Sequence, residues 1–207
     1  MTNSERITNN NEALGNLIDL AENLPDASGE IPTAEQNYAE NVAHIDLPNI
    51  TKIKANAFAE NTTLQTVTMP KVTTINKNAF AWCSNITTVD APKLQVIGVA
   101  GLSGCSKLAW TELPSGLKTI DQQGLNACSK LAITEIPSSV TYIGYQAFRN
   151  TKFTSLTFKG TPQTIVSTAF EGNTNLTTIN VPWAEGAVAN APWGATNATI
   201  NYNYTGE

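Results

Sequence analysis

Apolar and polar residues alternate in short segments along the middle of the chain, and most of these segments end at a proline. In the segment 64–69, Val67 and Met69 are separated by one polar residue, which is the period of a β-strand. Pro70 follows, and because proline has no N–H to donate to the next position of a ladder, the strand should stop there. The pattern therefore predicts many short strands separated by turns.

These segments recur at a nearly constant interval. A large apolar residue marks each unit, and the marks are 22, 22, 23, 23 and 22 residues apart: Phe58, Phe80, Leu102, Leu125, Phe148 and Phe170. A single unit cannot bury its own apolar face, whereas stacked units share one continuous core. We therefore expect a β-rich solenoid of six to seven turns, with seven parallel strands in its main ladder and a length of roughly 30 Å.

The repeat predicts three parts, namely an N-terminal segment (1–41), the solenoid (42–182) and a C-terminal segment (183–207). The first segment has apolar residues at helical spacing, at Ile7, Leu14, Leu17, Ile18, Ala21 and Leu24. We expect a helix and a linker, with the helix either covering the first turn or forming a homo-oligomer through residues 5–24. The last segment should cap the open edge of the stack, with Trp183, Trp193, Tyr202 and Tyr204 as cap residues.

Composition narrows the classes of function. Charged residues make up 14% of the chain and the net charge is −5, so a nucleic-acid partner is not expected, because phosphate contacts need clustered Lys and Arg. The sequence has no long apolar run, so we expect no membrane insertion. The first residues do not combine a basic segment with an apolar one, so we also expect no signal peptide.

Few residues could carry chemistry. Cys83, Cys105 and Cys128 each lie three residues after a mark, where other units carry Asn61, Thr151 and Asn173. A position shared by Cys, Asn and Thr predicts a corner at which a small side chain bonds the backbone. We expect buried thiols there, with a disulfide between neighbouring turns as the open alternative. Because His44 is the one histidine, we expect no metal, no cofactor and no enzymatic activity.

Strand alternation also predicts an outward face. On one outward column, Trp110 and Ile133 stand where neighbouring units carry Thr or Ser. Asp90, Glu112 and Glu135 lie on the adjacent column. Exposed large apolar side chains beside polar groups are typical of recognition sites. We predict that these five residues bind an apolar patch with a positive rim, unless the N-terminal segment or an edge of the cap covers them.

The repeated units resemble a known family. The pattern Val-x-x-Ile-x-x-x-Ala-Phe-x-x-Cys-x-x-Leu-x-x-Val-x-x-Pro, best seen from Val72 to Pro92, resembles the BspA-like leucine-rich repeat and covers residues 42–182. The tail 183–207 resembles the C-terminal cap of such proteins encoded in gut Firmicutes and their prophages. The resemblance implies a right-handed leucine-rich repeat coil of 22–23 residues per turn. It also implies a non-enzymatic binding protein that is associated with a surface or a phage tail.

These observations lead to two functional hypotheses. The first is a non-catalytic interaction module that holds a protein or carbohydrate ligand on a bacterial or phage surface. The alternative is a structural tail or fibre component of a prophage, in which the N-terminal helix trimerises. The expected location is accordingly the cell surface, the extracellular space or a phage virion. The lack of a signal peptide favours the phage alternative if residue 1 is the natural start.

Overall fold

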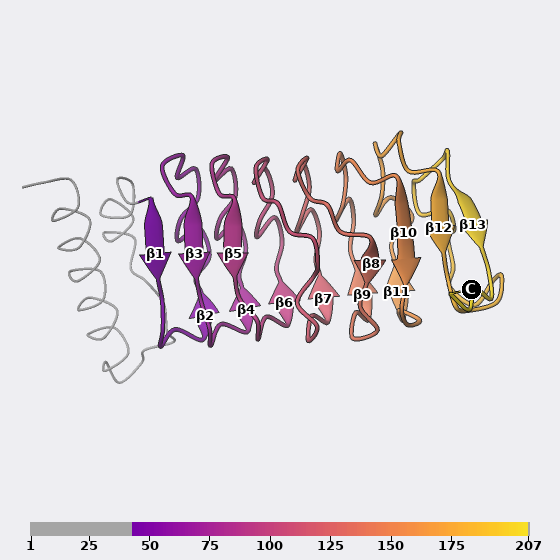
Figure 1. Ribbon diagram of the computed structural model, residues 1–207, viewed down its shortest axis with the longest axis horizontal. Helices are drawn as coiled ribbons and strands as arrows, with labels where there is room; N and C mark the ends of the chain where they lie inside the picture. The colour runs from indigo at the N-terminus through magenta and orange to yellow at the C-terminus, as the bar shows by residue number, and fades with distance from the viewer. Residues whose placement is uncertain (1–42, 207) are drawn as a thin grey trace, which may run out of the picture.

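The computed structural model describes residues 43–206. Within this range the chain winds as a parallel β-solenoid of about seven turns, stacked along the long axis of the molecule (Figure 1). The solenoid predicted from the repeat is thus confirmed. The predicted helix and linker, residues 1–41, lie outside the described residues.

Strands form two faces of the solenoid. The main face carries β1 (His44–Asp46), β3 (Thr66–Thr68), β5 (Thr88–Asp90), β8 (Glu135–Ile136), β10 (Ser155–Phe158), β12 (Thr178–Asn180) and β13 (Thr199–Asn201). The second face carries β2 (Lys52–Ile53), β4 (Thr74–Ile75), β6 (Val96–Ile97), β7 (Thr119–Ile120), β9 (Tyr142–Ile143) and β11 (Thr164–Ile165). We number coils 1–7 by their main-face segments, which are 44–46, 66–68, 88–90, 110–112, 133–136, 155–158 and 178–180.

Parallel pairing keeps equivalent residues of successive coils in contact. On the main face Val67 lies between Ile45 and Val89, and all three side chains are buried. On the second face Ile75 lies between Ile53 and Ile97 in the same way. Each coil therefore adds an apolar layer to a core that runs the length of the stack.

Aromatic rings fill the corner between the two faces. Phe58 stacks on Phe80 with ring centroids 5.1 Å apart and planes at 6°. Further along the stack, Phe148 and Phe170 repeat this arrangement at 5.4 Å and 4°. Leu102 and Leu125 occupy the same slot between the two pairs and are fully buried, as the repeat predicted. The large residue that marks each unit is therefore a core residue.

The main ladder is interrupted at coil 4, although the ladder of the second face is not. The main face divides into the order β1-β3-β5 and the order β13-β12-β10-β8, whereas the second face pairs all six of its strands in the order β11-β9-β7-β6-β4-β2. The segment 110–112 forms no strand. The prediction of seven strands in one continuous main ladder is wrong at this coil.

The C-terminal residues continue the stack. β13 pairs in parallel with β12, and Trp183 and Trp193 are buried, with ring centroids 5.2 and 6.2 Å from that of Phe158. The assignment of residues 183–207 as a separate cap stays a prediction. Among residues 43–206 no helix has the length and apolar character needed to cross a membrane.

Candidate functional site

The interruption at coil 4 begins with a change in which side chains point inward. In most coils the middle of the main-face segment is a buried apolar residue, at Ile45, Val67, Val89, Leu156 and Ile179. In coils 4 and 5 this slot holds Thr111 and Thr134, and both are exposed. The preceding residues, Trp110 and Ile133, turn toward the core instead. Burial of a large apolar side chain in place of a threonine hydroxyl drives this local change.

This change in the inward position contradicts the prediction for one of the site residues. Ile133 is only 2% exposed, so its prediction as an outward binding residue is wrong. Trp110 is half-buried, and its ring packs against the core. Its indole Nε1–H donates a hydrogen bond of 2.8 Å to the backbone carbonyl of Val89 in coil 3. Trp110 is therefore fixed against the neighbouring coil and presents only part of its side chain.

The backbone beyond Trp110 leaves the ladder. The carbonyl of Val89 accepts the indole N–H of Trp110. Within residues 43–206, no backbone carbonyl accepts a hydrogen bond from the N–H groups of Thr111, Glu112 or Leu113. Thr111 and Glu112 are exposed, whereas Leu113 is buried, so water or a partner can reach the N–H groups of the first two residues.

Two hollows flank this unpaired segment. One has a volume of about 320 Å³ and lies between Asp90 of coil 3 and Trp110 of coil 4. The other has a volume of about 560 Å³ and extends from coil 4 to Glu135 and Lys159 of coils 5 and 6. Their shared wall consists of Glu112, Leu113 and Ser115. Both hollows therefore lie at the break in the ladder.

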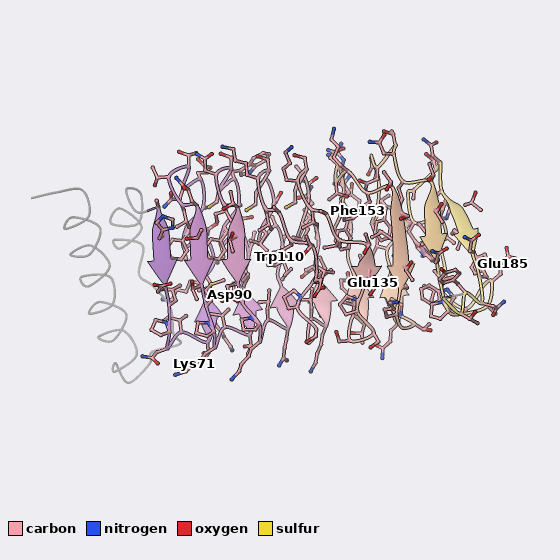
Figure 2. The ribbon with its side chains drawn as sticks, viewed as in Figure 1. Lys71, Asp90, Trp110, Glu135, Phe153 and Glu185 are labelled. Atoms are coloured by element: carbon pink, nitrogen blue, oxygen red, sulfur yellow. The ribbon has the colours of Figure 1, made fainter. Side chains whose placement is uncertain are left out.

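Acidic side chains surround the hollows. Asp90, Glu112 and Glu135 are all exposed, as their outward column predicted. Figure 2 places Trp110 between Asp90 and Glu135 along the long axis. The Nζ of Lys159 lies 2.8 Å from a carboxylate oxygen of Glu135, and both side chains are about half exposed. No cation of the described part of the chain forms an ion pair with Asp90 or Glu112.

The sequence contained a signal for this change that the alternation argument missed. Threonine occupies the inward slot in two successive units, at Thr111 and Thr134, and a larger apolar residue precedes each. That combination favours a shift of the inward position by one residue. The ion pair of Lys159 had no comparable signal, because it depends on how coils 5 and 6 stack.

The cysteines occupy the corner predicted for them. All three are buried and free, and their Sγ atoms bond a backbone carbonyl of the preceding coil: Cys83 to Phe58 at 2.8 Å, Cys105 to Phe80 at 3.2 Å and Cys128 to Leu102 at 3.2 Å. Asn173 donates in the same way to the carbonyl of Phe148. Burial raises the pKa of Cys83 and of Cys128 to about 12. These thiols are structural groups, and no cluster of three or more metal-ligating side chains exists within residues 43–206.

Comparison with known proteins identifies the repeat. The family model of the BspA type leucine rich repeat region matches residues 29–131 and 73–186, in six copies. The chain belongs to the BspA-type leucine-rich repeat family. Repeats of this family are typical of protein-binding modules rather than of enzymes.

Several solved structures of bacterial leucine-rich repeat proteins are similar to this chain, and the first shares its fold. The T. pallidum leucine rich repeat protein is 22% identical, with a TM-score of 0.54 over 78% of this chain and 70% of that one. A leucine-rich repeat protein from Eubacterium ventriosum is 26% identical, with a TM-score of 0.47 over 52% of this chain and 30% of its own length. A leucine rich cell surface protein from Faecalibacterium prausnitzii is 17% identical, with a TM-score of 0.32 over 85% and 83% of the two chains. Comparison with curated proteins found no match.

Proposed function

We propose that this BspA-type module binds another protein through the interrupted main face of coils 3–5. The observation that supports this proposal is the departure of coil 4 from the ladder. It leaves two hollows of about 320 and 560 Å³ on either side of Glu112, Leu113 and Ser115. A regular main face would be a flat sheet, whereas this face is concave and has unpaired backbone groups at its centre.

The charge around the hollows indicates the chemistry of the partner. Asp90, Glu112 and Glu135 would attract a segment that carries Lys or Arg, and steering by such charges mainly raises the association rate. Lys159 already pairs with Glu135 and shows that an ammonium group fits at this rim. The unpaired N–H groups of the exposed Thr111 and Glu112 can bond to the carbonyls of an extended chain. The proposed partner therefore presents an extended basic segment.

The finer hypotheses concern where the module acts. A position on a bacterial or phage surface, a carbohydrate ligand on this face, and the prophage tail alternative all stay predictions. The trimer in the last hypothesis would form through residues 5–24, which lie outside the described residues. Light scattering on the full chain tests it, because a trimer would have three times the 22.1 kDa of one chain. A strict monomer would contradict the tail-fibre alternative.

A peptide selection tests the binding face. A phage-displayed library of random peptides would be selected on the immobilised full chain and then compared on variants. Ser115→Trp fills the wall shared by both hollows and should abolish binding of most selected peptides. Asp90→Asn and Glu112→Gln should each weaken binding at low salt by about fivefold. Asp46→Asn is the matched control, because Asp46 is an exposed carboxylate on the same column in coil 1.

The outcome is decisive in either direction. Peptides enriched in Lys and Arg, which lose affinity for the coil 3–4 variants and keep it for Asp46→Asn, would support the proposal. Peptides that bind Ser115→Trp as tightly as the unaltered chain would contradict it. Selection without any basic enrichment would reject the proposed charge complementarity while leaving the hollow as the binding surface.

A further inference from the structure

Trp82 is the most exposed large apolar side chain of the described residues, at 57% exposure, and sequence reasoning did not single it out. It lies in the corner that follows β4, and it lines neither of the two hollows. Tyr145, at 44%, is the other large apolar side chain that is exposed, three coils further along. Trp82 is therefore a solitary aromatic group outside the surface described above.

The backbone under Trp82 adopts a conformation that suits other residues better. Equivalent corner positions of successive coils all have positive φ, at Glu60, Trp82, Gly104, Ala127, Asn150 and Gly172. Gly and Asn adopt this region readily, whereas an aromatic residue at φ +63° is uncommon and strained. The positive φ belongs to the geometry of the repeat, and Trp82 is the aromatic residue among these six positions.

Gly104 of the next coil supports the indole ring. A Cβ on Gly104 would lie 2.5 Å from Cε3 and 2.8 Å from Cδ2 of Trp82, so the six-membered ring lies directly on the backbone of Gly104. Trp82 as a whole residue is 57% exposed although its ring rests on Gly104. Trp82 is thus a flat aromatic platform that rests on backbone atoms and is open to solvent.

Polar groups rather than apolar ones follow Trp82 along the corner. Ser84 lies two residues after Trp82 in the sequence and is half-buried, and Asn85 is the next residue. The Nζ of Lys107, in the next coil, donates a hydrogen bond of 2.7 Å to Oδ1 of Asn85. The Oγ of Ser106 donates to the carbonyl of Ser84 at 3.4 Å. Hydroxyl, amide and ammonium groups therefore lie on the same corner as the platform.

We propose that Trp82 is a stacking platform for a pyranose ring of a glycan, with the Lys107 ammonium as a hydrogen-bonding partner of its substituents. The Asn85 amide holds Lys107 in place, because its Oδ1 accepts from Lys107 and its Nδ2 donates to the carbonyl of Thr62. One face of a pyranose presents C–H groups that pack on the negative face of an indole, and its edge presents hydroxyls. A protein partner would need further exposed large apolar groups around the indole to form an interface core, and among residues 43–206 this corner offers none. The inference is independent of the proposed function of the main face.

Glycan binding by the full chain tests this inference. A panel of defined oligosaccharides that includes cellotriose and trigalacturonate would be screened, and the ligands found would be titrated by NMR while the indole N–H signals of the four tryptophans are followed. The signal that disappears in Trp82→Ala should shift, and that variant should lose at least tenfold in affinity. Lys107→Gln separates the two sugar classes, since it should weaken trigalacturonate much more than cellotriose.

Three variants serve as controls. Tyr145→Ala removes the other exposed aromatic ring and should leave the affinity unchanged. Trp82→Phe keeps a smaller platform and should retain part of the affinity. Gly104→Ala should displace the indole and reduce binding, provided its urea midpoint shows a folded chain. The inference is overturned if no oligosaccharide binds, if binding is equal in Trp82→Ala, or if Trp82→Ala impairs only a protein ligand.

Discussion

Replacing Ile133 with alanine should destabilise the solenoid, although the regular alternation of the strands would place this residue on the surface. The side chain is only 2% exposed. Removing three carbons from the core loses about 0.8 kcal/mol for each buried CH₂ group, or roughly 2.4 kcal/mol. The cavity left behind adds to this loss. We therefore expect the free energy of unfolding to fall by about 2.5–4 kcal/mol.

Urea unfolding of matched variants measures this difference. Thr88→Ala is the control, since Thr88 occupies the same column in coil 3 and is exposed, and its effect should stay within about 0.5 kcal/mol. With a slope of about 2–3 kcal/mol per molar urea, Ile133→Ala should lower the midpoint by roughly 1–2 M. Circular dichroism and tryptophan fluorescence should both be recorded, because coils of a solenoid can unfold separately. Equal midpoints for the two variants would refute the inward position of Ile133.

Three further perturbations follow from the packing and charge of the described residues. Phe80→Ala should lower the free energy of unfolding by about 3–5 kcal/mol, because its ring is fully buried in the aromatic corner, and a thermal shift below about 4 °C would contradict this. Burial raises the pKa of Cys83 and Cys128 from 9.0 to about 12, so the thiols of the unfolded chain lose their protons at lower pH than those of the folded chain. The free energy of unfolding in urea should therefore be constant below about pH 9 and fall from pH 9 to 12. Cys→Ala variants at these two positions should flatten that fall. Lys159→Met should change stability by less than about 1 kcal/mol, because the ion pair is half exposed, while binding of a basic peptide should strengthen as the carboxylate is freed.

The fold was largely predictable because one physical requirement repeats along the chain. Each coil must place its apolar residues against the same slots of its neighbours, so the sequence shows that requirement six times. The interval between Phe58 and Phe80, for example, already fixes which side chains stack at 5.1 Å. Leu102 and Leu125, which replace phenylalanine in this slot, are buried in the same position, because any large apolar side chain fills that layer.

The candidate site was harder to predict because it arises where the repeat is broken. Strict alternation placed Ile133 outside, whereas the threonine at 134 makes burial of Ile133 more favourable. The hollows depend on how coil 4 settles after Trp110 bonds to coil 3, which local patterns do not specify. The exposure of Trp82 depends on a backbone conformation that only the folded corner reveals.

Hydrogen exchange across the main face tests the central claim most directly. In the free full chain, the amides of Thr111, Glu112 and Leu113 should exchange far faster than those of β5 and β10, because no backbone carbonyl accepts from them. Saturation with a selected basic peptide should slow these three amides and leave β1 unchanged. Slow exchange of 111–113 in the free chain, or protection by the peptide that avoids coils 3–5, would contradict the interrupted face as the binding site.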